Sequence, residues 1–444
     1  MHSMLIPIAV FLVVYFFIAT ELIDKTIAAL IGAGLMIGLH LVGYEEALHA
    51  IDLNVLFLLI GMMVVVNTLT ETGVFEWLAI KLARAAKGNG LLIAVFFMVL
   101  TAVLSAFLDN VTTVILMAPI TILLCQLLEI PAPPILIMEA VFSNIGGTST
   151  LVGDPPNILI GSQTHLSFND FIVNLGPPVL IMMVLLVAAM AFMFRKSIRT
   201  SAGTRKRVEN SRPEKAILEP VVLKKALVVF GLILAGFFGG RLLDIEPGII
   251  ALAGAMLMVL VCRKDIHHSL LHVEWNTILF FSGLFMMIAA LEHYGVFEEM
   301  GNFILKICDG NLMATALTIL WFSAIASAIV DNIPLVMAMI PLLNGIIPIF
   351  ARSLLGIDGP IEEVLQNPEV QAQITEPLFW ALALGACLGG NGTLVGASAN
   401  VVISQIANRN NCPISFMSFT KYGFPFMLAS LVVAHIYLYI RFFM

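Results

Sequence analysis

The chain has 444 residues, of which 60% are hydrophobic and only 11% are charged. Soluble proteins carry about 25% charged residues, so this composition excludes an ordinary soluble domain and indicates an all-α integral membrane protein. The net charge is −7 and no part of the chain forms a basic domain, which argues against nucleic-acid binding. The five cysteines show neither a metal-ligand spacing nor a disulfide pattern, so we expect no metal site and no cofactor.

Apolar segments predict five membrane spans in the first half of the chain, each about long enough to cross a bilayer. They cover residues 4–22, 26–42, 54–70, 136–163 and 173–194. Residues 91–128 add two apolar arms that meet at Asp109-Asn110. A polar turn at that depth cannot face lipid, so we predict a re-entrant hairpin. Two ordinary full spans are the alternative, because the arms are long enough for them.

The segment Ser143–Asn157 interrupts the fourth span in its middle. It contains three glycines, the pair Pro155-Pro156 and Asp154. Proline lacks an N–H and glycine weakens helices, so the helix must break here. Irregular backbone at membrane depth is tolerated only where it is buried in protein or lines a cavity. The break therefore predicts a substrate or ion site on a discontinuous helix, with a proline-kinked structural helix as the alternative.

The second half of the chain repeats this arrangement. Its predicted spans are 226–241, 248–262, 276–291, 377–408 (broken) and 422–442. A second predicted hairpin, 313–350, has Asp331-Asn332 at its tip, 222 residues after Asp109-Asn110. The breaks Gly146–Asn157 and Gly389–Asn400 align 243 residues apart, and a polar loop at 352–376 accounts for the extra residues. Two halves with matching broken spans are typical of secondary transporters.

Loop charges predict the orientation of the chain in a cell (cytoplasmic) membrane. Ten basic residues lie between Arg195 and Lys225, which indicates a cytoplasmic segment. Counting spans from there places the acidic loop 352–376 and both termini outside. Five spans separate corresponding loops, so the halves have inverted topology. We divide the chain into a first repeat (1–196), a basic linker (197–221) and a second repeat (222–444).

Acidic side chains inside apolar segments predict ion or proton coupling. Asp109 and Asp331 lie at the hairpin tips, where they can also cap the helix that follows. Asp154 has no acidic counterpart, because Ala397 occupies that position in the second repeat. Asn157 and Asn400 complete the predicted coupling set. Glu139 precedes the first break and is either a relay acid or a residue at the lipid edge.

Neutral polar side chains at the tips and breaks are the predicted substrate contacts, because no Lys or Arg lies in the middle of any predicted span. A highly charged anion would then depend on helix N-termini and amides alone. We expect a neutral or weakly charged solute, and we interpret Cys387 as a small packing residue. The predicted contacts are Asn110, Thr112, Asn144, Gly147, Thr148, Asn332, Gly390, Asn391 and Thr393.

The motif Gly146–Asn157, together with Asp109-Asn110 and Asp331-Asn332, resembles the ion transporter superfamily. Within it, the chain is most similar to the branch that groups arsenite-efflux permeases (ArsB type), NhaD-like sodium/proton antiporters and the P (pink-eyed dilution) protein. The resemblance implies two inverted repeats, each with a hairpin and a discontinuous helix, homodimers in many members, and elevator-type alternating access. Dicarboxylate carriers of the superfamily have Ser-Asn-Thr motifs in both halves, whereas here Ser143-Asn144 lacks the following threonine.

These features predict a secondary active transporter and not an enzyme. The leading hypothesis is proton-coupled efflux of arsenite or antimonite, a small inorganic solute that is largely an uncharged hydroxide at neutral pH. Sodium/proton antiport is the second hypothesis, and dicarboxylate or other anion transport is the third. A non-transporting receptor is a further alternative. No nucleotide-binding motif occurs in the loops, so an ATP-driven role would require an ATPase partner subunit.

Overall fold

A computed structural model describes residues 2–20, 22–164 and 166–444, and these residues form helices and connecting turns without a β-strand. Within that part of the chain, nine helices are long and apolar enough to cross a membrane, and three shorter apolar helices accompany them. The structure confirms the predicted fold, with ten spans, two re-entrant hairpins and two discontinuous helices. The predicted spans and the observed helices agree to within about six residues at each end.

Ten helices are formed by the described residues of the first repeat. They are α1 (His2–Thr20), α2 (Lys25–Gly38), α3 (Tyr44–His49), α4 (Leu53–Glu71), α5 (Val74–Ala85), α6 (Gly90–Leu108), α7 (Asn110–Leu128), α8 (Pro133–Gly147), α9 (Pro155–Gln163) and α10 (Phe168–Phe194). The linker contributes α11 (Ala202–Glu209) and the short 3₁₀ helix η1 (Pro213–Ala216).

The second repeat follows the same order. Its helices are α12 (Pro220–Leu243), α13 (Pro247–Cys262), α14 (Ile266–Leu271), α15 (Trp275–His293), α16 (Val296–Ile307), α17 (Leu312–Ile329), α18 (Asn332–Phe350), α21 (Glu376–Gly389), the 3₁₀ turn η4 (Gly390–Gly392), α22 (Ser398–Arg409) and α23 (Phe416–Phe442). The segment predicted as a polar loop is partly helical. It contains the π-turns η2 (Ala351–Leu355) and η3 (Gln371–Thr375), α19 (Ile361–Gln366) and α20 (Pro368–Val370).

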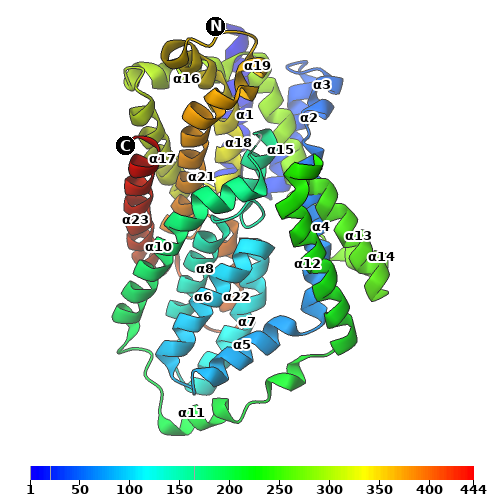
Figure 1. Cartoon of the computed structure of the whole chain (residues 1–444), viewed down its shortest axis with the longest axis vertical. Coiled ribbons are helices and arrows are strands. Elements are labelled where there is room, and N and C mark those ends of the chain that lie inside the picture. The colour runs from blue at the N-terminus through cyan, green and yellow to red at the C-terminus, as the bar shows by residue number, and fades with distance from the viewer. Residues whose placement is uncertain (1, 21, 165) are drawn as a thin grey trace.

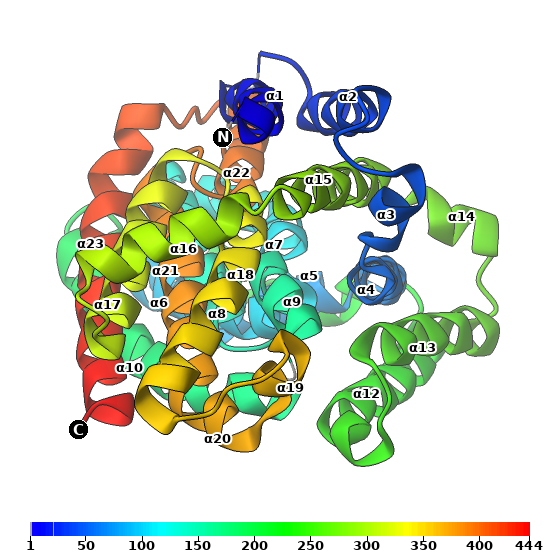
Figure 2. The same cartoon turned by 90° about the horizontal axis from the view of Figure 1, so that it is seen from above.

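The first helices of each repeat pack on the other repeat, and we call this group (α1, α2, α4, α12, α13 and α15) the scaffold. Helix α2 packs against α15, and α13 packs against α4. Glycines permit both contacts. A Cβ at Gly61 would lie 2.5 Å from the backbone of Ala251, and one at Gly283 would lie 2.9 Å from that of Ala29. Figure 2 shows α12 and α13 apart from the central bundle.

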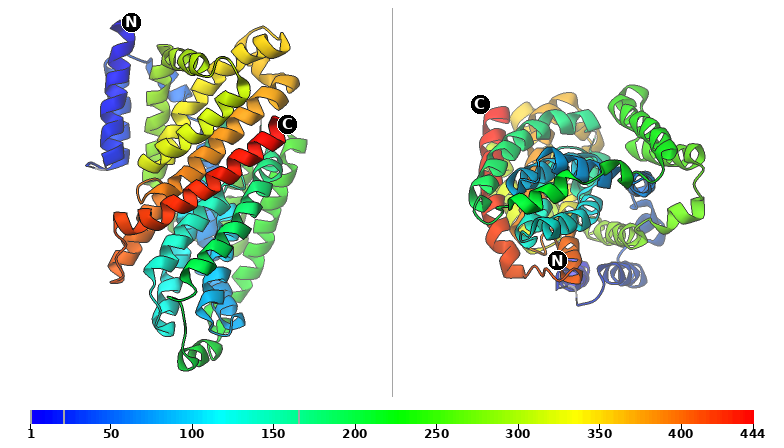
Figure 3. Two further views of the ribbon diagram at one scale, coloured as in Figure 1. Left: turned by 90° about the vertical axis from the view of Figure 1, so that its left-hand side faces the viewer. Right: turned by 90° about the horizontal axis from the view of Figure 1, so that it is seen from below.

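The hairpins and broken helices form a second group, which we call the core bundle (α6–α10, α17, α18 and α21–α23). Helix α6 packs on α8 and α17 on α21, while α7 crosses to α22 and α18 crosses to α9. Helices α6 and α7 lie in the lower half of Figure 1 and α18 lies in the upper half, so the hairpins enter from opposite sides. Figure 3 shows α10 and α23, which close the two repeats, side by side.

Two amphipathic helices connect the scaffold to the core bundle. Helix α5 lies across the lower part of Figure 1 and α16 lies across its top. Each begins after a glycine in the left-handed region, Gly73 (φ 76°) and Gly295 (φ 70°), because the chain turns sharply out of the preceding span. The linker helix α11 lies at the lower end of the molecule, opposite α19 and the N-terminus.

Candidate functional site

The hairpin tips and helix breaks meet in a buried network of amides. Asn110 donates through Nδ2 to Asn144 Oδ1 and to Asp154 Oδ1, at 3.1 Å in each case. Asn144 in turn donates across the repeats, to Asn391 Oδ1 at 2.9 Å and to Asn400 Oδ1 at 3.2 Å. Five predicted site residues from both repeats are therefore linked by hydrogen bonds at one place.

Two equivalent asparagines stabilise the broken helices. Asn157 Nδ2 donates to the carbonyl oxygens of Thr148 at 3.0 Å and Thr150 at 2.9 Å. In the second repeat, Asn400 Nδ2 donates to Gly390 O at 2.8 Å and Thr393 O at 2.9 Å. These bonds satisfy carbonyl groups that lose their helical partners at the break, as buried backbone requires. Coupling by Asn157 and Asn400 remains a prediction.

Several residues predicted to contact the substrate instead bond to, or pack against, the protein backbone. Thr148 Oγ1 donates to Asn144 O at 2.7 Å, and Thr393 Oγ1 donates to Ala328 O at 2.6 Å. Gly147 and Gly390 pack against the backbone of their own breaks, since a Cβ at Gly147 would lie 2.4 Å from Gly153 O. None of these four residues lines the central cavity described below. Their contact with a substrate remains a prediction.

The tip aspartates cap the second helix of each hairpin. Thr112 donates to Asp109 twice, from its backbone N–H to Oδ1 at 2.8 Å and from its hydroxyl to Oδ2 at 2.6 Å. Asp331 accepts from Ile333 N–H at 3.2 Å. Both carboxylates thus satisfy free donors at a helix N-terminus. A capping carboxylate can also bind a proton, so the coupling role of these two residues stays a prediction.

Lys25 is a site residue that the sequence analysis missed. It begins α2, and its ammonium lies 3.0 Å from Asp331 Oδ2 and 3.0 Å from Ser398 Oγ. Ser398 also donates to Asp331 Oδ2 at 2.9 Å. The scaffold is therefore joined by an ion pair to the tip of the second hairpin. Lys25 was outside the apolar core of every predicted span, and nothing in its neighbourhood in the sequence indicated this partner.

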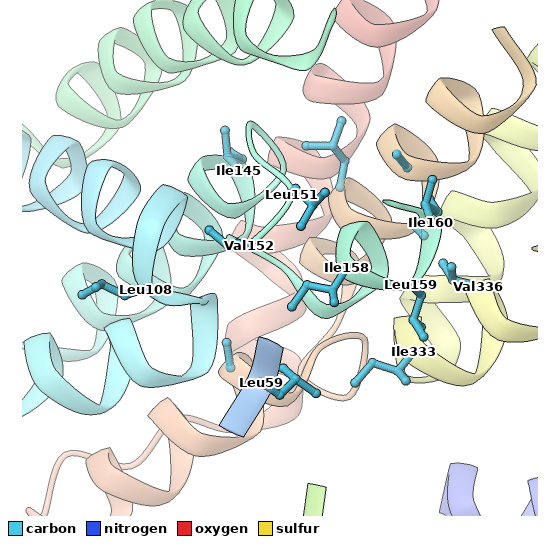
Figure 4. Close-up of a cluster of buried hydrophobic side chains, with 14 of the residues drawn as sticks. Leu59, Leu108, Ile145, Leu151, Val152, Ile158, Leu159, Ile160, Ile333 and Val336 are labelled. Carbon is cyan, nitrogen blue, oxygen red and sulfur yellow. The ribbon is translucent and has the colours of Figure 1, made fainter. Parts of the chain in front are cut away.

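A cavity of about 210 Å³ lies between the scaffold and the core bundle. Its polar lining comes from both groups: Lys25, Asp109, Asn110, Thr112, Asp154, Glu274, Thr277, Asn332 and Ser398. Its apolar wall includes Leu59, Leu108, Val152, Ile158 and Ile333, and Figure 4 shows these side chains coming from α4, α6, the first break, α9 and α18. Five of the predicted site residues thus share one cavity.

Four buried polar atoms around this cavity and the amide network have no hydrogen-bond partner among the described residues. They are two acceptors, Asn110 Oδ1 and Asp154 Oδ2, and two donors, Asn332 Nδ2 and Asn391 Nδ2. Unpartnered buried groups are rare in folded proteins and cost free energy. Since Asn110 and Asp154 bond to each other, their free oxygens lie in the same small region. An ion, a proton or a solute group can satisfy them.

Glu139 is a second buried acid. Its side chain is fully buried, and it accepts a hydrogen bond from Thr121 through Oε1 while Oε2 has no partner among the described residues. The lipid-edge alternative is therefore wrong. Cys387 is buried too, and its thiol lies 3.5 Å from Asn157 Oδ1.

Comparisons with known proteins give consistent matches along the chain. The CitMHS family, described as citrate transporter, matches residues 15–360. An uncharacterized transporter of Mycobacterium bovis is 39% identical over 442 residues, which are 99% of this chain and 98% of that protein. An uncharacterized transporter of Synechocystis is 35% identical, over 98% and 96% of the two chains.

Two further matches bear on the resemblance and on the fold. The P protein of Sus scrofa is 32% identical over 507 residues, which are 96% of this chain and 58% of that protein. The YdaH transporter of Alcanivorax borkumensis superposes with a TM-score of 0.58 at 14% identity, over 89% and 87% of the two chains. The predicted similarity to the P protein is confirmed, and the solved structure supports the fold alone.

Proposed function

Because the chain belongs to the CitMHS transporter family, we propose that it is a secondary active transporter driven by a cation bound at Asp154. The observation that carries this proposal is the pair of unpartnered oxygens at Asp154 and Asn110. Asp154 is fully buried beside a helix break. An isolated carboxylate is very costly to bury, so a proton or a sodium ion must accompany it.

The charges around the cavity support a cation. Three acids, Asp109, Asp154 and Glu274, line it together with one base, Lys25. Lys25 is also paired with a fourth acid, Asp331. The excess of carboxylates over ammonium groups attracts cations, and it repels anions unless some of these acids are protonated.

A small neutral hydroxide is our first candidate for the solute, and arsenite or antimonite is the chemical class. A hydroxide both donates and accepts hydrogen bonds. The unpartnered atoms are also of both kinds, with Asn332 and Asn391 offering donors and Asn110 and Asp154 offering acceptors. Export coupled to inward proton movement is the direction that the sequence analysis predicts.

A carboxylate is the second candidate, and Lys25 is the observation that favours it. Lys25 and Asn332 both line the cavity, and an ammonium and an amide N–H can each bind an oxyanion. The family description names citrate. A carboxylate with several charges would need the cavity acids to be neutralised first, which again couples its binding to cations. Sodium/proton antiport without a further solute is the remaining alternative.

Transport requires the core bundle to move relative to the scaffold, and few polar contacts hold the two together. Besides the Lys25–Asp331 pair, Asn54 of α4 donates to Ser162 Oγ of α9 at 3.0 Å. Next to it, Gln163 donates to Asp52 Oδ2 at 2.6 Å. Lys25 also contacts Ser398 of α22, and Asn169 of α10 donates to Phe238 O of α12, each at 3.0 Å. The contacts between the moving surfaces must break when the site opens to the opposite side.

We further propose that the end bearing α11 is cytoplasmic and the end bearing α19 and both termini is outside, because the basic and acidic segments divide that way. Single cysteines placed at 205 and 362 test this on intact cells with a membrane-impermeant thiol reagent. Only the cysteine at 362 should react before the cells are permeabilised. Equal labelling of both positions would contradict the inverted orientation.

The solute is identified by a transport panel in proteoliposomes. Arsenite, citrate, succinate and sodium are supplied separately under an imposed proton or sodium gradient. Accumulation of arsenite alone supports the first candidate, and accumulation of citrate or succinate supports the second. Sodium-dependent proton flux without either solute supports antiport. No gradient-driven flux with any of them would contradict the proposal.

Asn332→Ala should weaken solute transport about tenfold, because one hydrogen bond is worth roughly 0.5–1.5 kcal/mol. Asn332 lines the cavity with its side chain next to Asp154, and its Nδ2 makes no hydrogen bond of ordinary geometry within the described residues. Cys387→Ser is the comparison variant: its buried thiol contacts Asn157 and Asp154 without lining the cavity, and serine keeps a hydrogen-bonding group there, so it should be nearly silent. Transport measured at low solute concentration gives both values. Loss of transport in Cys387→Ser together with normal transport in Asn332→Ala would favour a thiol site.

A further inference from the structure

Three metal-ligating side chains gather at the end of the scaffold, outside the transport site. Glu71 ends α4, and His268 and His272 belong to α14 and the residue after it. One ligand atom from each residue lies within 4.8 Å of the other two. His268 Nδ1 lies 3.4 Å from Glu71 Oε1, and its side chain is 57% exposed, so an ion can reach the group from water.

The hydrogen bond of His272 leaves one ring nitrogen ready for a metal. Its Nδ1 lies 2.9 Å from the carbonyl oxygen of His268. A carbonyl oxygen only accepts, so Nδ1 must carry the hydrogen. In the neutral ring, Nε2 then keeps its lone pair. A histidine that donates one N–H to a backbone carbonyl and presents its other nitrogen is the usual form of a metal ligand.

The carboxylate of Glu71 is held by two other neighbours. Asn67 Nδ2 donates to its Oε1 at 3.1 Å, and Lys264 Nζ lies 3.0 Å from its Oε2. Lys264 also contacts Glu219, with Nζ 3.0 Å from its Oε1. Because Lys264 occupies Oε2 of Glu71, Oε1 is the oxygen on the side of the histidines, 3.4 Å from His268 Nδ1.

The other repeat offers a comparison within the same molecule. At positions 222 residues away, His293 and Glu46 form the corresponding pair, with His293 Nδ1 at 3.0 Å from Glu46 Oε1. The acid and the histidine have exchanged places between the repeats. Ala50 stands where the first group has His272. The second pair therefore lacks the third ligand.

We propose that Glu71, His268 and His272 bind a divalent transition-metal ion of the zinc class, with water completing its coordination. Two imidazoles and one carboxylate are a donor set that Zn²⁺ accepts in proteins. The bound ion would tie α14 to the end of α4. Residues 71 and 268 are far apart in sequence and belong to different repeats, so cysteine and histidine spacing gave no sign of this site.

Zinc titration of the purified full-length chain, with its affinity tag removed, tests the proposal. A chromogenic chelator competes for the metal, and size-exclusion chromatography checks that each variant is folded. The wild-type chain should bind one equivalent of Zn²⁺ that His268→Ala and His272→Ala both lose. His293→Ala, which removes the corresponding histidine of the other pair, should keep that equivalent with unchanged affinity.

A second substitution tests the geometry. Ala50→His supplies the missing ligand beside His293 and Glu46, and it should add a second equivalent of bound zinc. The proposal is overturned if the wild-type chain binds no zinc, if the folded His272→Ala protein retains the wild-type affinity, or if His293→Ala removes the binding. None of these measurements depends on transport, so failure here leaves the transporter proposal untouched.

Discussion

Asp154→Asn should abolish gradient-driven accumulation of the solute and leave a folded, membrane-inserted protein. Asparagine has nearly the same shape and can keep the hydrogen bond from Asn110, which reaches Asp154 Oδ1 at 3.1 Å. It cannot bind a proton at this position, and its neutral amide is a much poorer partner for sodium. Accumulation in proteoliposomes under an imposed gradient should therefore fall to background.

Two controls separate coupling from stability. Asp358→Asn removes an exposed acid that forms an ion pair with exposed Arg352, and surface ion pairs contribute little. It should transport normally. Exchange of labelled against unlabelled solute, which needs no gradient, should survive in Asp154→Asn. Full gradient-driven accumulation by this variant would remove Asp154 from the mechanism.

Cross-links between the scaffold and the core bundle should abolish transport. The internal repeat predicts which pairs of residues can be cross-linked. In this structure Asn54 contacts Ser162. The corresponding positions of the second repeat are Asn276 and Gln405. Because the repeats are inverted, the state that opens to the opposite side should bring Asn276 next to Gln405.

The measurement uses paired cysteines joined by a short thiol reagent. Asn54→Cys with Ser162→Cys should cross-link in one state, and Asn276→Cys with Gln405→Cys in the other. Each cross-link should reduce transport to background, and reduction should restore it if the linker is cleavable. An Asn54→Cys and Gln405→Cys pair is the mismatched control and should not cross-link. Full transport by either cross-linked protein would show that the two groups do not move relative to each other.

The sequence predicted the fold closely because its signals are local and repeated. The lengths of the apolar segments predicted the spans. Glycine and proline at membrane depth predicted the break at Ser143–Asn157. The polar tips favoured hairpins over full spans. The 222-residue repeat then supplied a second, independent copy of each element. The helical turns within 351–375 were missed, because a polar segment of this kind carries no clear period.

The candidate site was predicted only in part because its contacts join distant segments. Lys25 and Asp331 are 306 residues apart, and Asn144 bonds to an asparagine 247 residues later. Such pairs depend on how the scaffold lies against the core bundle, which no local pattern specifies. For Thr148 and Thr393 the residue type suggested a solute contact. In the structure their hydroxyls donate to backbone carbonyl oxygens instead.

The most direct test of cation coupling is the ion flux that the solute itself drives. Proteoliposomes containing a trapped pH-sensitive or sodium-sensitive dye receive a solute gradient without any imposed ion gradient. The wild-type chain should move protons or sodium ions in proportion to the solute, and Asp154→Asn should move none. Solute flux through the wild-type chain with no accompanying ion, or the same ion flux in Asp154→Asn, would contradict the account.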